Sequence, residues 1–182
     1  YSPGLSIDEI QEKYGLARVI KMASNENPLG ASALVQERIK AKAATVFRYA
    51  QSGTPKLQNA LAAKLGVPAK NIVLGNGSDE IIDLIIRCCA TPGTHNIVAS
   101  KPSFSLYELQ SKFGGVHFIS VPLNADFTFD WQGLRSAVTE NTAVVFITTP
   151  DNPSGYCPKV EEVRAFAKSL PPTCLLVVDE AY

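Results

Sequence analysis

The sequence has few residues that could bind a metal ion or form a disulfide. Its only histidines, His95 and His117, lie in separate segments, and none of its four cysteines belongs to a C-x-x-C pair. Cys88 and Cys89 are adjacent and stand within an apolar helical pattern. Zinc sites need several such ligands at short spacings, and unpaired thiols are typical of proteins from a reducing compartment. We therefore expect free thiols, no metal site and a cytoplasmic location.

An excess of charge and long apolar runs are also missing. The 17 basic residues balance the 17 acidic ones, so the sequence lacks the basic character of a nucleic-acid-binding protein. No apolar run approaches the roughly 20 residues that a membrane helix requires. The hydrophobic fraction of 46% is nevertheless enough to build a core. These features predict a globular protein with neither a nucleic acid nor a membrane as partner.

From residue 71 onward, short apolar runs alternate with helical patterns. The expected strands are 72–74, 96–99, 116–121, 143–148 and 174–178, and the expected helices are 78–90, 104–113, 131–138 and 160–169. Such an alternation predicts an α/β fold in three layers, with helices on both faces of a mainly parallel sheet.

The first part of the chain has a different pattern. Ser6 and Glu9 have the spacing of a capping box that opens a short helix ending near Gly15, and a polar loop and an alanine-rich helix follow. We expect residues 1–45 to form an N-terminal arm and part of a small domain. Residues 46–182 are expected to form a large domain. The chain begins at Tyr1 without a methionine and stops directly after an apolar run, so both ends look cut.

A glycine-rich junction precedes the helix expected at 78–90. Gly75 and Gly77 allow a sharp turn, and the free amides of the following helix could bind a phosphate near Ser78 and Asp79. The third glycine of the dinucleotide-binding motif is missing, because Glu80 takes its place. Taken alone, the junction could equally be an ordinary glycine turn with Ser78 as a helix cap.

Three other predicted strands are followed by aromatic or polar side chains: Phe104, Asn152 and Asp179. Taken singly, Phe104 could be a core residue and Asn152 part of a rigid turn between two prolines. The carboxyl ends of parallel strands, however, gather at the edge of a sheet where α/β proteins bind ligands. There Phe104 could stack on a ring, Asn152 could bond a ring oxygen, and Asp179 could pair with a protonated ring nitrogen. Pyridoxal phosphate has each of these groups and a phosphate as well.

Four motifs of the sequence occur in the order found in the fold-type I aminotransferases, which use pyridoxal phosphate. They are Asn25-Glu26-Asn27-Pro28, Gly75-Asn76-Gly77-Ser78-Asp79-Glu80, Asp151-Asn152-Pro153-Ser154-Gly155 and Asp179-Glu180-Ala181-Tyr182. The chain resembles this family over nearly its whole length, and most of all the branch that acts on histidinol phosphate. It resembles the N-terminal half or so of such an enzyme. The resemblance implies an incomplete large domain of that fold, a pyridoxal 5'-phosphate cofactor and a homodimer.

The resemblance also implies roles at the cofactor. Asp179 would keep the pyridine nitrogen protonated, which makes the ring an electron sink, and it would be a catalytic residue together with Tyr182. Asn152 and Tyr182 would hydrogen-bond the phenolic oxygen of the ring. Ser78 and Asp79 would lie at the cofactor phosphate.

Four further residues receive roles from the same resemblance. Phe104 would take the ring-stacking position, where many relatives have tyrosine. Tyr49 would reach across a homodimer interface to the phosphate of the neighbour's cofactor. Tyr1 and Asn27 would line the substrate entrance.

The lysine that carries the cofactor in this family lies downstream of the Asp-Glu-Ala-Tyr motif, beyond Tyr182. Ser100-Lys101 and Ser111-Lys112 contain the same dipeptide, but both precede the aspartate, so neither is assigned as the Schiff-base lysine. The segment alone is therefore expected to be inactive. The whole enzyme is expected to convert histidinol phosphate and 2-oxoglutarate to imidazole acetol phosphate and glutamate, in histidine biosynthesis.

Other functions fit the same motifs. An aromatic amino-acid aminotransferase or a threonine-phosphate decarboxylase would share all four. A non-catalytic domain that binds the cofactor or has a regulatory role belongs to a different class, and a dinucleotide-binding domain is disfavoured by the missing glycine.

Overall fold

The larger part of the molecule is built on a parallel sheet. The computed structural model describes residues 4–182, which divide into two compact units, one that ends at Leu57 and one that spans Gln58–Tyr182. The second unit holds four strands in the spatial order β2-β1-β3-β4, and all three pairings are parallel. The strands are β1 (Asn96–Lys101), β2 (His117–Pro122), β3 (Thr142–Thr148) and β4 (Leu175–Asp179). The α/β fold expected from the sequence is thus confirmed.

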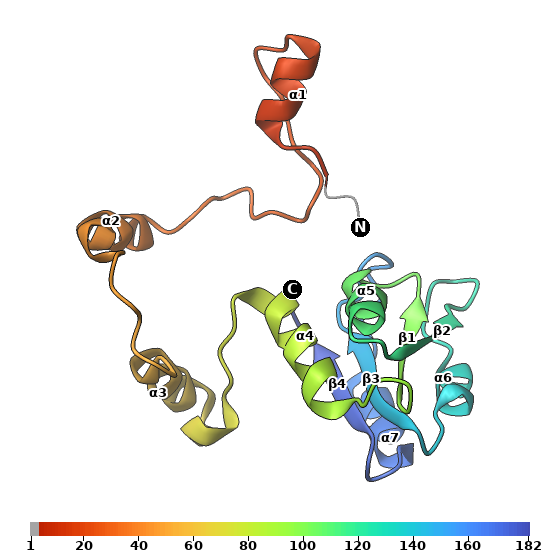
Figure 1. Cartoon of the computed structure of the whole chain (residues 1–182). Helices are drawn as coiled ribbons and strands as arrows, with labels where there is room; N and C mark the ends of the chain where they lie inside the picture. The colour runs from red at the N-terminus through yellow and green to blue at the C-terminus, as the bar shows by residue number, and fades with distance from the viewer. Residues whose placement is uncertain (1–3) are drawn as a thin grey trace. The chain divides into compact units, whose positions relative to one another are not determined.

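Helices cover both faces of this sheet (Figure 1). One face packs against α4 (Gly77–Cys89) and α5 (Leu106–Phe113), and the other against α6 (Trp131–Ala137) and α7 (Val160–Ser169). Because successive side chains of a strand point to opposite faces, a strand covered on both sides is apolar along its whole length. The central strand β3 shows this directly, since all seven of its residues are buried.

Two apolar clusters hold the three layers together. On one face, Ile82 and Ile86 of α4 and Tyr107 of α5 pack against Phe146 of β3. On the other face, Leu134 of α6 and Phe166 of α7 pack against the alternate residues of the same strands. Each helix presents an apolar stripe at helical spacing, and burying these stripes against the sheet supplies most of the stabilisation of such a fold.

The strand expected at residues 72–74 does not form, so this expectation was wrong. The segment has no regular structure and pairs with none of the four strands. A strand exists only where a neighbouring strand takes its backbone hydrogen bonds. Here the carbonyl of Ile72 accepts a hydrogen bond from the Gln58 side chain at 2.8 Å instead, and Val73 is exposed.

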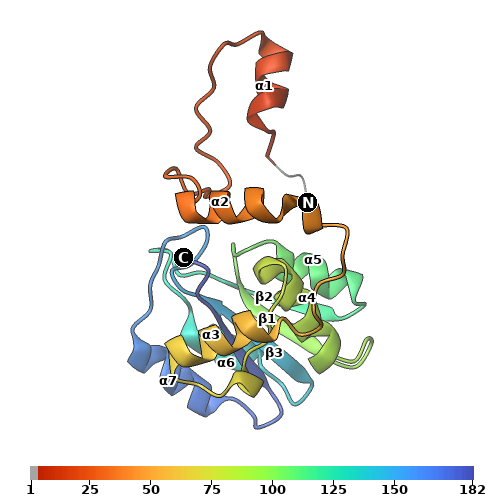
Figure 2. The same ribbon diagram turned by 90° about the vertical axis from the view of Figure 1, so that its left-hand side faces the viewer.

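The first unit consists of short helices joined by extended segments (Figure 2). Helix α1 (Ile7–Tyr14) begins with the expected capping box, in which the Glu9 amide donates to Ser6 Oγ and the Ser6 amide donates to the Glu9 carboxylate. Helix α2 (Ala33–Lys42) continues into the 3-10 turn η1 (Ala43–Thr45). Neither α1 nor α2 buries a residue, so their apolar side chains find no core within the described part of the chain.

Two further elements lie between α2 and the helices and strands of the sheet. Helix α3 (Pro55–Leu65) contains the boundary between the two units, and the 3-10 turn η2 (Ala69–Asn71) follows it. Across residues 4–182, none of the helices combines the length and the apolar character needed to cross a membrane.

Candidate functional site

The carboxyl ends of the parallel strands form the edge at which the predicted groups gather. In the register of the sheet, Thr148 at the end of β3 lies opposite Asp179 at the end of β4. The backbone links the two ends as well, because the Thr149 amide donates to the carbonyl of Asp179 at 2.9 Å. The segments that follow β1 and β3 contain cis prolines, at Pro102, Pro150 and Pro153. The register and the Thr149–Asp179 hydrogen bond hold the ends of β3 and β4 side by side at this edge.

Asp179 is half-buried at this edge, and neutral donors hold both of its carboxylate oxygens. The Tyr107 hydroxyl donates to Oδ2 at 2.6 Å, and the Ala181 amide donates to Oδ1 at 3.2 Å. Within residues 4–182 no basic side chain forms an ion pair with this carboxylate. A carboxylate oxygen can accept more than one hydrogen bond, so this half-buried carboxylate can still take a cationic partner.

Tyr107 is a site residue that the sequence analysis missed. Its side chain is fully buried, its ring stacks on Phe146 with centroids 4.4 Å apart, and its hydroxyl also bonds Thr148 Oγ1 at 2.8 Å. Burial raises the pKa of Tyr107, and the hydrogen bond to Asp179 raises this pKa further, so the phenol stays protonated and remains a donor. One signal could have found it: Tyr107 lies three residues after Phe104 in the segment that follows the same strand, and a tyrosine hydroxyl that becomes buried requires a polar partner.

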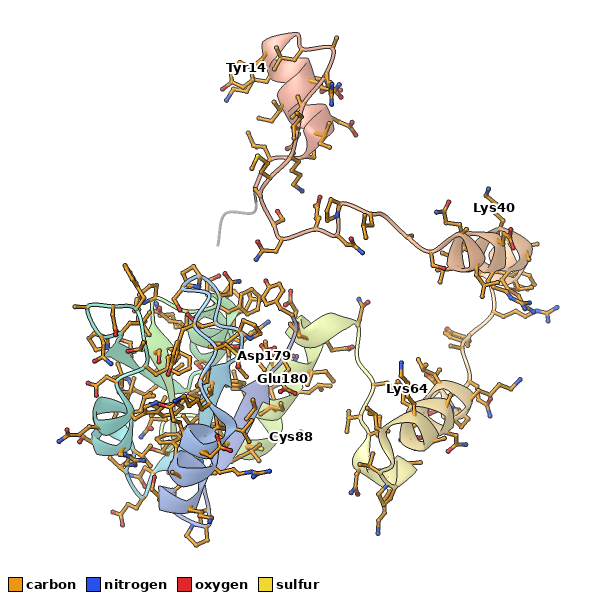
Figure 3. The ribbon with its side chains drawn as sticks, turned by 180° about the vertical axis from the view of Figure 1, so that it is seen from behind. Tyr14, Lys40, Lys64, Cys88, Asp179 and Glu180 are labelled. Carbon is orange, nitrogen blue, oxygen red and sulfur yellow. The ribbon has the colours of Figure 1, made fainter. Side chains whose placement is uncertain are left out.

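A cavity of about 290 Å³ joins Asp179 to the beginning of α4. Ser78 and Asp179 both line it, and Ile81, Ile85 and Val177 contribute apolar walls. Figure 3 shows Asp179 and Glu180 at the end of β4 nearest the start of α4, with Cys88 near the other end of that helix. The structure therefore brings together two of the predicted groups that are about 100 residues apart in the sequence.

The beginning of α4 is the predicted phosphate-binding junction. Gly77 adopts a left-handed backbone with φ +80°, and the Asn76 side chain makes no capping hydrogen bond. The Asn76 amide itself donates to the Glu80 carboxylate, so a negative group already lies at this helix end, where the helix dipole favours one. Ser78 lines the cavity, whereas Asp79 is exposed on the same turn and does not line it.

The loop after β3 is fixed by Asp151, which is buried with 4% of its surface exposed. Its Oδ2 accepts hydrogen bonds from the Ser154 amide at 3.2 Å and from Ser154 Oγ at 2.5 Å. The next residue, Asn152, is half-buried, and its amide nitrogen donates to the Tyr182 hydroxyl at 3.3 Å. The structure therefore places Asn152 and Tyr182 in contact at this edge, as a pair.

The remaining predicted residues lie in less defined surroundings. Phe104 is half-buried and makes an edge-to-face contact with Tyr107, with centroids 5.7 Å apart, but it does not line the cavity. Tyr49 and Asn27 belong to the first unit and are exposed, and Asn27 Oδ1 accepts a hydrogen bond from the Leu29 amide at 3.0 Å. Tyr1 lies outside the described residues.

The two lysines that follow a serine are engaged elsewhere. Glu108 of α5 accepts hydrogen bonds from Lys112 at 2.7 Å and from Lys101 at 2.9 Å. These contacts, first with Lys112 and then with Lys101, lower the pKa of Glu108 to about 2. Among the described residues, no group of three His, Cys, Asp or Glu side chains is placed to hold a metal ion.

Comparison with known proteins identifies the family of the chain. The model of aminotransferase class I and II matches residues 17–182. The chain belongs to this family. Histidinol-phosphate aminotransferases of Oleidesulfovibrio alaskensis and Nitratidesulfovibrio vulgaris are 63% and 61% identical to it over all 182 residues. These residues make up 48% and 49% of the two relatives, so the chain spans about half the length of the curated relatives it matches.

Solved structures show the same fold. The histidinol-phosphate aminotransferase of Sinorhizobium meliloti, in complex with pyridoxal-5'-phosphate, superimposes with a TM-score of 0.87 at 30% identity. The match covers 98% of this chain and 48% of that one. The enzyme of the same name from Clostridium acetobutylicum gives a TM-score of 0.74 at 26% identity, over 88% of this chain and 46% of that one. The parallel sheet and its helices are thus those of the fold-type I aminotransferases.

Proposed function

We propose that the protein is a pyridoxal-phosphate-dependent aminotransferase and that this chain forms its cofactor-binding part. The main support is the position of the Asp179 carboxylate, which is held by the Tyr107 hydroxyl and a backbone amide. Asp179 lines a cavity that Ser78, at the start of α4, also lines. A fixed carboxylate at one end and a helix N-terminus at the other match a cationic ring that carries a phosphate. Membership of the aminotransferase family supports the same function.

The groups at this edge of the sheet and at the start of α4 fit this cofactor. Asp179 would accept a hydrogen bond from the protonated ring nitrogen, and the amides of Ser78 and Asp79 would bind the phosphate. Asn152 and Tyr182, which already contact each other, would bond the ring oxygen. When bound, pyridoxal phosphate supplies an electron sink for the carbanion of the substrate, and the carboxylate of Asp179 keeps the ring in its protonated form.

The ring would also need a partner over its face. Phe104 would supply this stacking surface from the turn that follows β1. Its edge-to-face contact with Tyr107 links it to the same residue that holds Asp179.

The proposed reaction transfers the amino group of histidinol phosphate to 2-oxoglutarate, giving imidazole acetol phosphate and glutamate, in histidine biosynthesis. The support is the likeness to histidinol-phosphate aminotransferases, at 61–63% identity along the whole chain. We further propose a cytoplasmic homodimer in which residues 1–45 form an arm and part of a small domain, and residues 46–182 the large domain. In that assembly Tyr49 would reach the neighbour's cofactor phosphate, and Tyr1 and Asn27 would line the substrate entrance.

Adding pyridoxal phosphate to the full-length protein tests this proposal. We expect an absorbance band of bound cofactor that borohydride fixes covalently, and amino transfer from histidinol phosphate in preference to an aromatic amino acid or threonine phosphate. The variant Asp179→Asn should bind the cofactor more weakly and lose most of its activity. A protein without the band would be no aminotransferase of this kind, and a preference for another amino compound would replace histidinol phosphate as the substrate.

A further inference from the structure

We propose that Tyr107 is a positioning residue, whose hydroxyl fixes the Asp179 carboxylate for its contact with the ring nitrogen of pyridoxal phosphate. Thr148 in turn orients the Tyr107 hydroxyl for this task. The inference rests on the proposed function, because it assigns a role toward that cofactor. It adds Tyr107 of α5 and Thr148 of β3 to the site residues that were predicted from the sequence motifs.

The three side chains form a hydrogen-bonded chain with one direction. A tyrosine hydroxyl has a single proton, and a carboxylate oxygen can only accept. The 2.6 Å contact between Tyr107 Oη and Asp179 Oδ2 therefore uses the Tyr107 proton. It follows that Thr148 Oγ1, at 2.8 Å from the same Oη, donates its own proton to Tyr107.

The tyrosine is held too firmly to move its hydroxyl away. Tyr107 has no exposed surface, and its ring lies parallel to that of Phe146, with an angle of 11° between the planes. Phe104 closes the edge of the same ring at an angle of 83°. Because packed aromatic rings in a protein core have little freedom, the position of the hydroxyl is set by the core and not by the ligand.

The carboxylate is consequently held from two separate elements. Oδ2 is bound by α5 through Tyr107, and Oδ1 is bound by the backbone amide of Ala181 just after β4. An ionised carboxylate has about four acceptor positions, so two fixed donors determine its orientation and leave acceptor positions for a cationic ring. The buried hydroxyl of Tyr107 thus has both of its functions used, since it accepts from Thr148 and donates to Asp179.

The test compares two ligands of the full-length protein: pyridoxal phosphate and its 1-deaza analogue, in which a C–H group replaces the ring nitrogen. For Tyr107→Phe, we expect the Kd for pyridoxal phosphate to rise about threefold to tenfold, because the freed carboxylate must be ordered again on binding. The Kd for the analogue should stay unchanged, since it makes no bond to Asp179. Fluorescence titration measures both constants without reference to activity.

Variants at Thr148 test the same chain without altering the packed tyrosine. Thr148→Val should weaken pyridoxal phosphate in the same direction but by less, and Thr148→Ser should restore the wild-type Kd. The matched control is Tyr156→Phe, which removes a hydroxyl from a half-buried tyrosine on the other face of the sheet, where it contacts Phe129 and Glu162. We expect no change of either Kd in this control.

The outcomes separate the two proposals. If Tyr107→Phe weakens both ligands equally, or neither, the positioning role of Tyr107 is wrong while the proposed function stands. The same conclusion follows if Tyr107→Phe fails to fold and Thr148→Val leaves the Kd for pyridoxal phosphate unchanged. If the wild-type protein binds neither ligand, the proposed function itself is refuted, and this inference with it.

Discussion

Replacing Asp151 by alanine should destabilise the loop that carries Asn152. The buried Oδ2 of Asp151 accepts hydrogen bonds from Ser154 N at 3.2 Å and Ser154 Oγ at 2.5 Å. Hydrogen bonds to a charged group contribute about 1.5–3 kcal/mol each, but Ser154 is half-buried and water can replace part of both. We therefore expect the free energy of unfolding to fall by about 2 kcal/mol.

Urea unfolding of the full-length protein measures this loss, and the chain offers a matched control. Asp126 makes the same pair of bonds, to Thr128 N at 3.1 Å and Thr128 Oγ1 at 2.7 Å, but it lies on the surface. Because water can take over its bonds, Asp126→Ala should destabilise the protein far less. If the two substitutions lowered the free energy of unfolding equally, burial would not be what gives Asp151 its effect. The reasoning would then be refuted.

Two further changes test other parts of the second unit. Leu134 of α6 is fully buried, so Leu134→Ala should lower the free energy of unfolding by about 3 kcal/mol, as cavity-forming substitutions do. The control Val160→Ala, at an exposed position of α7, should have little effect in the same urea experiment. A loss at Leu134 no larger than that at Val160 would contradict the described core. The pKa of Glu108 is lowered from 4.5 to about 2 by Lys112 and Lys101, so its contribution to stability is present above pH 4.5 and lost as the pH falls toward 2. Surface ion pairs contribute only about 0–1 kcal/mol, so Glu108→Gln should slightly flatten the plot of unfolding free energy against pH between pH 4.5 and 2. An unchanged plot would argue against the two lysine contacts.

The sheet and its helices could be predicted because their signals are local. The apolar runs that became β1 and β3 lie between two helical layers, and burial on both faces requires an apolar side chain at nearly every position. The start of α1 was also predictable, since its capping box joins Ser6 to Glu9 within a single turn. Each of these signals is complete within about ten residues of sequence.

Residues 72–74 show where such local reasoning stops. Their apolar pattern is the same as that of a buried strand, but strand formation also requires a partner edge, and none of the described strands pairs with them. The pattern records the side-chain preference of the segment. Whether the segment forms a strand depends on pairing with a distant strand, and the local sequence does not show that pairing.

Tyr107 shows the same limit at the site. The sequence analysis chose Phe104 because it is the first aromatic residue after a predicted strand, and both Phe104 and Tyr107 fell within the helix expected at 104–113. The contact that distinguishes them joins Tyr107 to Asp179 across 72 positions of sequence, and it depends on how closely α5 and β4 approach. Motif reasoning could place Asp179 at the ligand edge, because that follows from strand direction alone. Which hydroxyl holds its carboxylate depends on the packing of α5 against the sheet, so the support of the site became visible only in three dimensions.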